Sequence, residues 1–228
     1  INKTSEYFKN YTSQEGKIPH FLWNCKMRFG KTYTTYKLAQ EMGWSKVLVL
    51  TFKPAVENSW IDDLYSHVDF EGWQFISRGS SSYDDIDNSK PFVCFASFQD
   101  FLGKNKLGGI KVKNEWAHLI NWDCIVLDEY HYGSWRETAK ELYESEDSKD
   151  LKEEKLNEME NWDESIVPLT TDGFLYLSGT PFRAIESGEF IEEQIFNWTY
   201  SDEQEAKENW EGDNNPYESL PRMVMMTY

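Results

Sequence analysis

Three short segments carry side chains suited to phosphate and metal chemistry. The first, 25–32, reads Cys-Lys-Met-Arg-Phe-Gly-Lys-Thr and lies between an apolar run and a helical pattern. In such a strand–loop–helix unit, backbone N–H groups and the helix N-terminus form a positive hollow for phosphates. Gly30 lets the backbone come close to the phosphates, and the Lys31 ammonium group places a positive charge beside the β- and γ-phosphates. Thr32 offers a hydroxyl to Mg²⁺. The residues expected to bind nucleotide are Arg28, Phe29, Gly30, Lys31 and Thr32.

The second segment, 124–131, is an apolar run that ends in two adjacent carboxylates. We expect Asp128 to bind Mg²⁺, directly or through water, and Glu129 to act as the general base for the attacking water. Taken alone, the segment is equally consistent with a strand that merely ends in acidic residues. The first segment favours the metal role, because P-loop chemistry needs a metal-binding Asp on a neighbouring strand. The expected cofactors are therefore ATP and Mg²⁺, with Lys31, Asp128 and Glu129 as the catalytic residues.

The third segment, 175–183, reads Leu-Tyr-Leu-Ser-Gly-Thr-Pro-Phe-Arg. Its apolar part predicts a strand that brings Ser178 and Thr180 to the carboxyl edge of a sheet, where ligands bind in open α/β folds. An ordinary Ser-Gly-Thr-Pro turn would explain the string by itself. Its position after the other two segments favours a place in the same site.

Short apolar runs that alternate with helical patterns must position these residues. Helices are expected at 32–42, at 56–67 and at 112–120, where Val112, Trp116, Leu119 and Ile120 share one face. The alternation predicts one α/β domain over 1–228, a mostly parallel twisted sheet with helices on both faces. The expected strands are 21–25, 47–52, 73–76, 92–96, 124–127, 174–177 and, near the C-terminus, 223–226.

The formal net charge of −17 is unevenly distributed. Residues 137–164 carry twelve acidic and four basic side chains, and residues 186–218 carry eleven and one, so the rest of the chain is close to neutral. A neutral remainder can present a local basic face, although it lacks the strongly basic balance of independent DNA-binding domains. We expect an acidic helical insertion at about 137–166 that is solvated, with partner binding or strand separation as the alternative.

Three cysteines lie far apart in the chain, each beside apolar or aromatic residues. They predict buried thiols in a reducing cytoplasm rather than a disulfide framework. No run of 18 apolar residues and no basic-then-apolar leader is present, so we expect neither a membrane span nor a secretion signal. A start at Ile1 rather than Met suggests an excised fragment. The cysteines are Cys25, Cys94 and Cys124.

In this order, Gly-Lys-Thr, Asp-Glu-Tyr-His and Ser-Gly-Thr resemble motifs I, II and III of superfamily 2 helicases, the second being similar to a DEAH box. The segment 47–60, with Pro54 and Trp60, looks like motif Ia, and 97–99 (Ser-Phe-Gln) resembles the segment after motif Ib. The resemblance covers about 20–185 and looks most like the motor of type I and type III restriction enzymes.

This resemblance implies the first RecA-like domain of an ATP-dependent helicase or translocase. His131, Ser178 and Thr180 would relay the nucleotide state to nucleic acid, DNA more than RNA, and to a second RecA-like domain. That second domain, with its arginine finger, is expected to be absent, so the fragment alone should scarcely hydrolyse ATP. The family's adenine-reading Gln is also missing, because Gln14 lacks the expected context.

Nucleic-acid binding of this kind is dominated by phosphate contacts, which lysines supply. Solvated surface lysines are the alternative for each candidate. Other readings are a stand-alone or phage DNA/RNA helicase, a P-loop enzyme that transfers phosphate to a small molecule, and an interaction module that only binds nucleotide. Motif III argues against the second reading, and intact Lys31, Asp128 and Glu129 argue against the third. The candidate nucleic-acid contacts are Lys53, Lys104, Lys106, Lys111 and Lys113.

Overall fold

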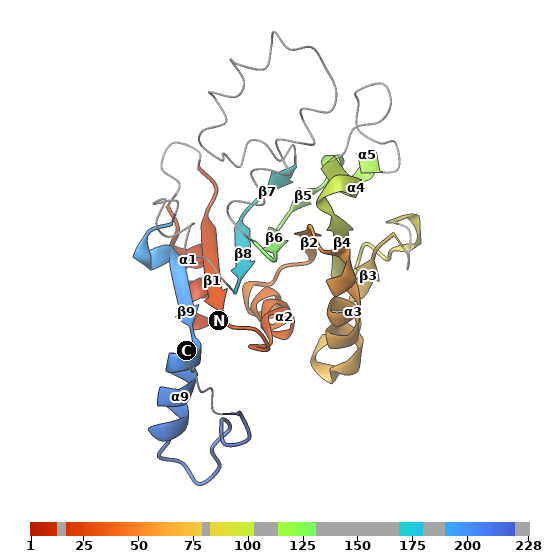
Figure 1. The fold of residues 1–228 in the computed structure, drawn as a ribbon. Helices are drawn as coiled ribbons and strands as arrows, with labels where there is room; N and C mark the ends of the chain where they lie inside the picture. Colours follow the sequence, from red (N-terminus) through yellow and green to blue (C-terminus); the bar gives the residue numbers. More distant parts are fainter. Residues whose placement is uncertain (13–16, 79–82, 103–113, 131–168, 180–189, 222–228) are drawn as a thin grey trace, which may run out of the picture.

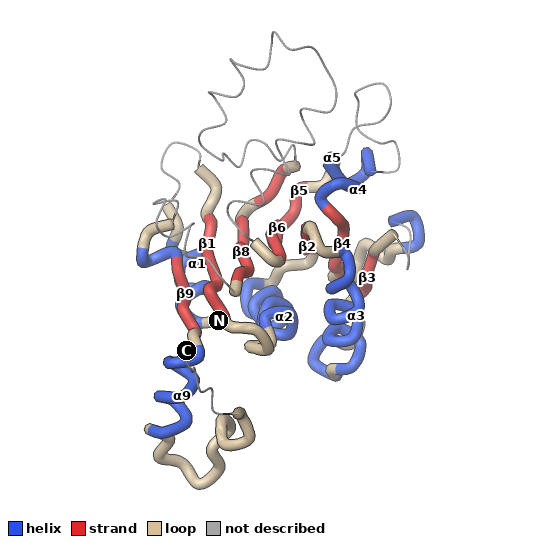
Figure 2. The backbone as a smooth tube through the Cα atoms, viewed as in Figure 1, coloured by secondary structure: helices blue, strands red, loops and turns tan. Residues whose placement is uncertain are grey.

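A seven-stranded sheet forms the centre of the chain. The structure, a computed structural model, describes all residues except 13–16, 79–82, 103–113, 131–168, 180–189 and 222–228. The strand order is β3-β4-β2-β6-β8-β1-β9, and all six neighbouring pairs are parallel. Figure 2 shows these strands side by side, with β9 and β3 at opposite edges. The strands are β1 (His20–Cys25), β2 (Lys46–Thr51), β3 (Gln74–Ile76), β4 (Phe92–Ser97), β6 (Cys124–Asp128), β8 (Phe174–Ser178) and β9 (Ile195–Trp198).

Helices connect or flank these strands in Figure 1. The α-helices are α1 (Asn2–Asn10), α2 (Lys31–Met42), α3 (Glu57–Ser66), α4 (Phe98–Leu102), α5 (Glu115–Leu119) and α9 (Tyr200–Glu208). A short 3₁₀ turn, η1 (Pro54–Val56), leads into α3. Two-residue strands β5 (Asn121–Trp122) and β7 (Thr170–Thr171) pair in a separate ladder.

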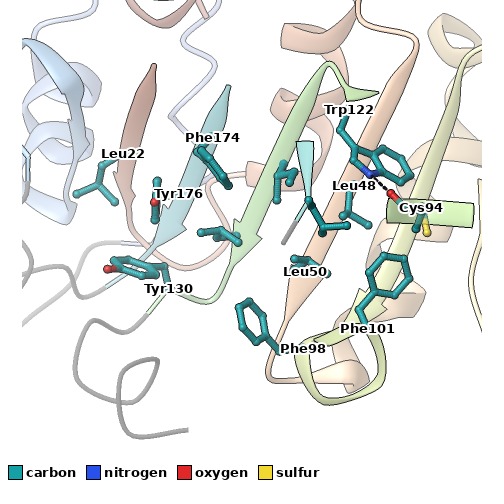
Figure 3. Close-up of a cluster of buried hydrophobic side chains, with 14 of the residues drawn as sticks. Leu22, Leu48, Leu50, Cys94, Phe98, Phe101, Trp122, Tyr130, Phe174 and Tyr176 are labelled. Atoms are coloured by element: carbon teal, nitrogen blue, oxygen red, sulfur yellow. Dashed lines mark hydrogen bonds between the residues drawn. The ribbon is translucent and has the colours of Figure 1, made fainter. Parts of the chain in front are cut away.

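Both faces of the sheet are buried, because successive residues of a strand point to opposite sides. In β2, Leu48 and Leu50 belong to one apolar cluster, whereas Val47 and Val49 belong to the other. The first cluster is covered by α4 and α5 and is drawn in Figure 3. The second is covered by α2 and α3, whose buried residues include Tyr36 and Trp60. Each face therefore has its own helical layer, as expected for a doubly wound sheet.

The predicted mostly parallel α/β sheet is confirmed, and six predicted strands appear within one or two residues of their expected ends. The predicted helices 32–42 and 56–67 correspond to α2 and α3. The predicted apolar face of 112–120 is wrong in part. The helix α5 is shorter, and Leu119 is 87% exposed because the helix ends there and turns its side chain to solvent. The predicted strand 223–226 and the acidic insertion lie outside the described residues.

Two elements that the sequence did not predict complete the β1 side of the sheet. The helix α1 is tied to β1 by a buried hydrogen bond in which Trp23 Nε1 donates to Thr4 Oγ1 at 2.9 Å. The strand β9 pairs with β1 on its free edge, and α9 continues beyond it (Figure 1). The strand β1, which leads into the predicted phosphate loop, therefore has β9 along its outer edge and α1 packed against it.

The three cysteines are free and buried, as predicted. Burial raises the pKa of the Cys25 thiol to about 12 and raises those of Cys94 and Cys124 as well. Within the described part of the chain, no helix has the length and apolar character needed to cross a bilayer.

Candidate nucleotide site

The carboxyl ends of β1, β2, β6 and β8 meet at one edge of the sheet. Strand register aligns Asn24 with Ser178, and Thr51 with Asp128. The strand β8 lies between β1, which leads into the phosphate loop, and β6, which ends in the acidic pair. Parallel strands spaced about 4.8 Å apart put the ends of β1 and β6 roughly 10 Å apart. The structure thus brings the first two predicted segments to one edge, with the third between them.

The loop between β1 and α2 has two residues with left-handed backbone angles, just before the helix begins. Arg28 and Gly30 both adopt left-handed backbone angles, with φ of 63° and 84°. Gly30 is the N-cap of α2, and a Cβ built on it would meet nothing within 4 Å. The N-terminus of this twelve-residue helix has no capping side chain and carries a partial positive charge. The space beside the Gly30 Cα is therefore open, at the end of the helix that attracts anions.

Lys31 folds back over this loop. Its Nζ donates to the carbonyl oxygens of Cys25, at 3.2 Å, and of Lys26, at 3.5 Å. These weak contacts hold the ammonium group above the loop, where a bound phosphate would replace the carbonyls as acceptor. Thr32 lies one residue further along the first turn of α2 and is half-buried. The predicted placement of Lys31 and Thr32 at the helix N-terminus is thus found in the structure.

The start of the loop is held by β9 and α9. The Lys26 amide donates to the Trp198 carbonyl at 3.0 Å. Its Nζ lies 2.5 Å from Glu203 Oε2, and the two side chains are only 8% and 5% exposed. The same ammonium lies 4.8 Å from the centre of the Tyr200 ring, within cation–π range. Lys26 is therefore committed to a buried ion pair and does not face a phosphate.

Phe29 also turns toward β9. Its ring centre lies 6.2 Å from that of Phe196 and 6.1 Å from that of Trp198. The side chain thus braces the loop against the edge strand. Of the predicted nucleotide-binding residues, Phe29 can offer only its backbone, whereas the Arg28 side chain is exposed.

Asp128 ends β6 as a largely buried carboxylate, 7% exposed. Its Oδ2 accepts from Trp60 Nε1 at 2.9 Å, and its Oδ1 accepts from the Glu129 amide at 2.8 Å. Burial raises the pKa of Asp128, and the Trp60 hydrogen bond opposes that rise, with a smaller lowering from the charge of Lys31. Two hydrogen bonds thus fix the Asp128 carboxylate at the end of β6.

Glu129 has a left-handed backbone, with φ of 55°, and its side chain is 31% exposed. A non-glycine residue in this region is uncommon and often lies at a functional site. The bend separates the two neighbouring carboxylates, so that Asp128 turns inward and Glu129 turns toward Lys53. Lys53 Nζ donates to Glu129 Oε2 at 3.4 Å.

The third segment closes the edge between the other two. Ser178 is fully buried at the end of β8, and a Cβ on Gly179 would lie 3.6 Å from the Cys25 carbonyl oxygen. Tyr130 donates its amide to the Leu177 carbonyl at 2.8 Å, and its ring packs on Tyr176 (Figure 3). The coupling candidates His131 and Thr180 lie outside the described residues.

Of the predicted nucleic-acid contacts, Lys53 lies within the described residues. Lys53 is 58% exposed just beyond β2. In the segment after motif Ib, Ser97 accepts from the Asp100 amide at 3.1 Å and Phe98 is buried. Both therefore support α4. Lys104, Lys106, Lys111 and Lys113 lie outside the described residues, as does Gln14.

The donor set fits Mg²⁺ bound together with a nucleotide. In the described part of the chain, no three His, Cys, Asp or Glu side chains gather to form a cage. Mg²⁺ usually keeps several waters and binds one or two carboxylates plus substrate phosphates. Thr32 and Asp128 could supply the protein ligands for such an ion.

Two features of the site were missed by the sequence analysis. Trp60 had been assigned only to motif Ia, yet it contacts the candidate metal-binding carboxylate directly. Its apolar, helical context gave no signal of that contact. Glu203 stands within a run of acidic residues, and nothing in its neighbours marks it as the one that pairs with Lys26.

Comparison with known proteins gives one clear sequence relative. No protein-family model matches the chain. A Mycoplasma pneumoniae (strain ATCC 29342 / M129 / Subtype 1) protein named "Putative type II restriction enzyme and methyltransferase RM.MpnORF110P C-terminus" is 33% identical over 223 residues. The match covers 89% of this chain and 31% of that protein. The chain thus spans about a third of the length of the relative it matches.

Two solved structures of the Sulfolobus solfataricus SWI2/SNF2 ATPase core are also similar. The core in complex with dsDNA gives a TM-score of 0.46 at 14% identity, over 79% of this chain and 30% of that one. The core domain gives 0.44 at 10% identity, over 80% and 30%. Both TM-scores lie below 0.5. The chain's own strand order shows a parallel α/β sheet in which β8 lies between the loop strand and the acidic strand.

Proposed function

We propose that this chain is the ATP-binding domain of an ATP-dependent nucleic-acid translocase that works within a restriction enzyme. The observation that carries the proposal is the meeting of the Gly30–Lys31 loop and the Asp128–Glu129 pair at one sheet edge. The restriction setting is supported by the name of the Mycoplasma pneumoniae relative. A motor of the type III kind is the finer form of the proposal, and it rests on the sequence motifs.

Each residue of the site has a distinct part in this function. The Gly30 backbone and the α2 N-terminus bind the phosphates, and Lys31 exchanges its two carbonyl acceptors for phosphate oxygens. Thr32 and Asp128 would hold Mg²⁺, which when bound would supply positive charge to the phosphates. Glu129 orients the attacking water toward the γ-phosphate and accepts its proton.

A second RecA-like domain elsewhere in the full-length protein supplies the rest of the site. An arginine finger from such a partner is worth about 10³ to 10⁵ in rate in related phosphoryl-transfer enzymes. Residues 1–228 by themselves are therefore expected to turn over ATP only at a small fraction of the full-length rate. Duplex DNA is the proposed track, contacted through its phosphates.

Steady-state ATPase activity of the full-length protein, with Mg²⁺ and with or without linear duplex DNA, tests the proposal. We expect DNA to stimulate turnover. Lys31→Ala should lose at least about tenfold in ATP affinity by calorimetry, because a charge-assisted contact is worth about 1.5–3 kcal/mol. Lys46→Ala is the matched control, since Lys46 is exposed at the opposite end of β2. Unchanged ATP affinity in Lys31→Ala would show that the loop is not the nucleotide site.

Glu129→Gln separates binding from hydrolysis. The amide keeps the size of the side chain but cannot take a proton, so ATP binding should persist while turnover falls by about 10²- to 10⁴-fold. Turnover at the parental rate would contradict the general-base role. Activity that depends on ATP but not on DNA would favour nucleotide binding or hydrolysis without translocation.

A further inference from the structure

One short segment touches both carboxylates of the proposed hydrolytic site. It begins where β2 ends and continues through η1 into α3. Thr51, the last residue of β2, is in register with Asp128, so the residues that follow the two strands lie side by side. Lys53 contacts Glu129 at 3.4 Å, and Trp60 contacts Asp128 at 2.9 Å. The two contacts differ sharply in burial.

Trp60 is 1% exposed, and its contact belongs to the core. Lys53 is 58% exposed, so solvent and any passing anion can reach its ammonium group. An ion pair as exposed as this favours contact over separation by only about fivefold or less. The Lys53–Glu129 pair is therefore weak enough to be exchanged, whereas the Trp60–Asp128 contact is a fixed part of the site.

The pair engages one of the two carboxylate oxygens of the proposed general base. A general base must accept a hydrogen bond from the water whose proton it takes. Glu129 Oε2 accepts from Lys53, which draws the carboxylate toward the end of β2. A phosphate of a nucleic-acid backbone presents the same acceptor chemistry to Lys53, with a full negative charge. Phosphate and Glu129 thus compete for one ammonium group.

We propose that Lys53 is a coupling residue, which restrains Glu129 when no nucleic acid is bound and exchanges it for a backbone phosphate when the track is bound. Release of Glu129 then permits hydrolysis only on the track. The inference rests on the proposed function, because it requires Glu129 to act as the base and nucleic acid to reach the end of β2. It predicts that loss of Lys53 uncouples turnover from nucleic acid.

The test compares ATPase rates of the full-length protein and its Lys53→Met variant, with and without saturating linear duplex DNA. Without DNA, Lys53→Met should hydrolyse ATP about two- to fivefold faster than the unmodified protein, the most that an exposed pair can restrain. The rate at saturating DNA should change by less than twofold, so the stimulation factor falls by the same two- to fivefold. DNA affinity, measured by fluorescence anisotropy, should weaken.

Two variants sharpen the comparison. Lys53→Arg keeps a cation that can pair with Glu129, so it should retain the low basal rate. Lys46→Met removes an exposed lysine from the opposite end of the same strand and should leave both rates unchanged. Thermal unfolding of each variant should match the unmodified protein, because both lysines are exposed.

An unchanged basal rate in Lys53→Met, with weaker DNA binding, would make Lys53 a phosphate contact alone and overturn the coupling role. A lower basal rate would make Lys53 an aid to hydrolysis and overturn it equally. Absence of DNA-stimulated turnover in the unmodified protein is a different result, because it overturns the proposed function before any variant is compared.

Discussion

The buried ion pair between Lys26 and Glu203 offers a quantitative test of how the phosphate loop is held. The two charged atoms are 2.5 Å apart, and both side chains are more than nine-tenths buried. Glu203→Leu removes the carboxylate and leaves the ammonium group buried against the Tyr200 ring. Removing one partner of a buried pair costs about 3–5 kcal/mol, because the remaining charge loses its compensation.

This cost should appear locally, as detachment of α9. The helix packs chiefly on β9 at the edge of the molecule (Figure 1), and its release lets water reach Lys26 without unfolding the sheet. Hydrogen exchange followed by mass spectrometry measures the opening directly. Protection of the α9 amides should fall by about a hundredfold to several thousandfold, which is 3–5 kcal/mol at 1.4 kcal/mol per tenfold.

The double variant Lys26→Met/Glu203→Leu is the matched control. Replacing both members of a buried pair by apolar residues of similar size is often neutral. Most of the α9 protection should therefore return. If Glu203→Leu changes that protection by less than tenfold, or if the double variant is no better than the single one, the pair does not hold α9 against the loop.

Three further predictions concern the site itself. Trp60→Phe removes a hydrogen bond that lowers the pKa of Asp128, so this pKa should rise further. As the pH is lowered, Mg²⁺-dependent ATP binding should then be lost at a higher pH than in the unmodified protein. Loss of binding at the same pH in both proteins would contradict this. Gly30→Ala and Gly43→Ala should each cost about 1–2 kcal/mol in urea unfolding, because both glycines are left-handed and neither position is crowded. Only Gly30→Ala should weaken ATP binding, and equal affinities would refute the loop's role. A thiol reagent at pH 8 should label no cysteine before the protein unfolds. A pKa of about 12 leaves roughly one Cys25 thiol in ten thousand as thiolate, and the other two thiols are also buried. Rapid labelling of the native protein would contradict this prediction.

The central strands could be predicted because both of their faces are buried. The segment Lys46–Thr51 is almost continuously apolar, and such a run has few alternatives to a core strand. Gly-Lys-Thr alone occurs in many proteins, and the loop 25–32 could be singled out because these residues stand between an apolar run and a helical pattern.

The edge of the sheet could not be predicted in the same way. In β9, only Ile195 is buried and Asn197 is exposed, so the strand lacks an apolar run and lies within an acidic stretch. The helix α1 is largely polar, and its attachment combines the Thr4–Trp23 hydrogen bond with packing of Tyr7 and Phe8 on the apolar cluster behind it. Pairings between distant residues, such as Lys26 with Glu203, leave no trace in local composition.

The position of β8 limits how the site can report its state mechanically. The strand is hydrogen-bonded to β1 on one side and to β6 on the other. Sliding it by one residue, about 3.3 Å, would break both ladders and turn its buried side chains to the wrong faces. The strand therefore keeps a fixed register between the strand that leads into the loop and the strand that ends in the acidic pair. A displacement caused by nucleotide turnover is therefore expected in the elements that follow the strand ends, such as α2 and α3, rather than as sliding of β8 within the sheet.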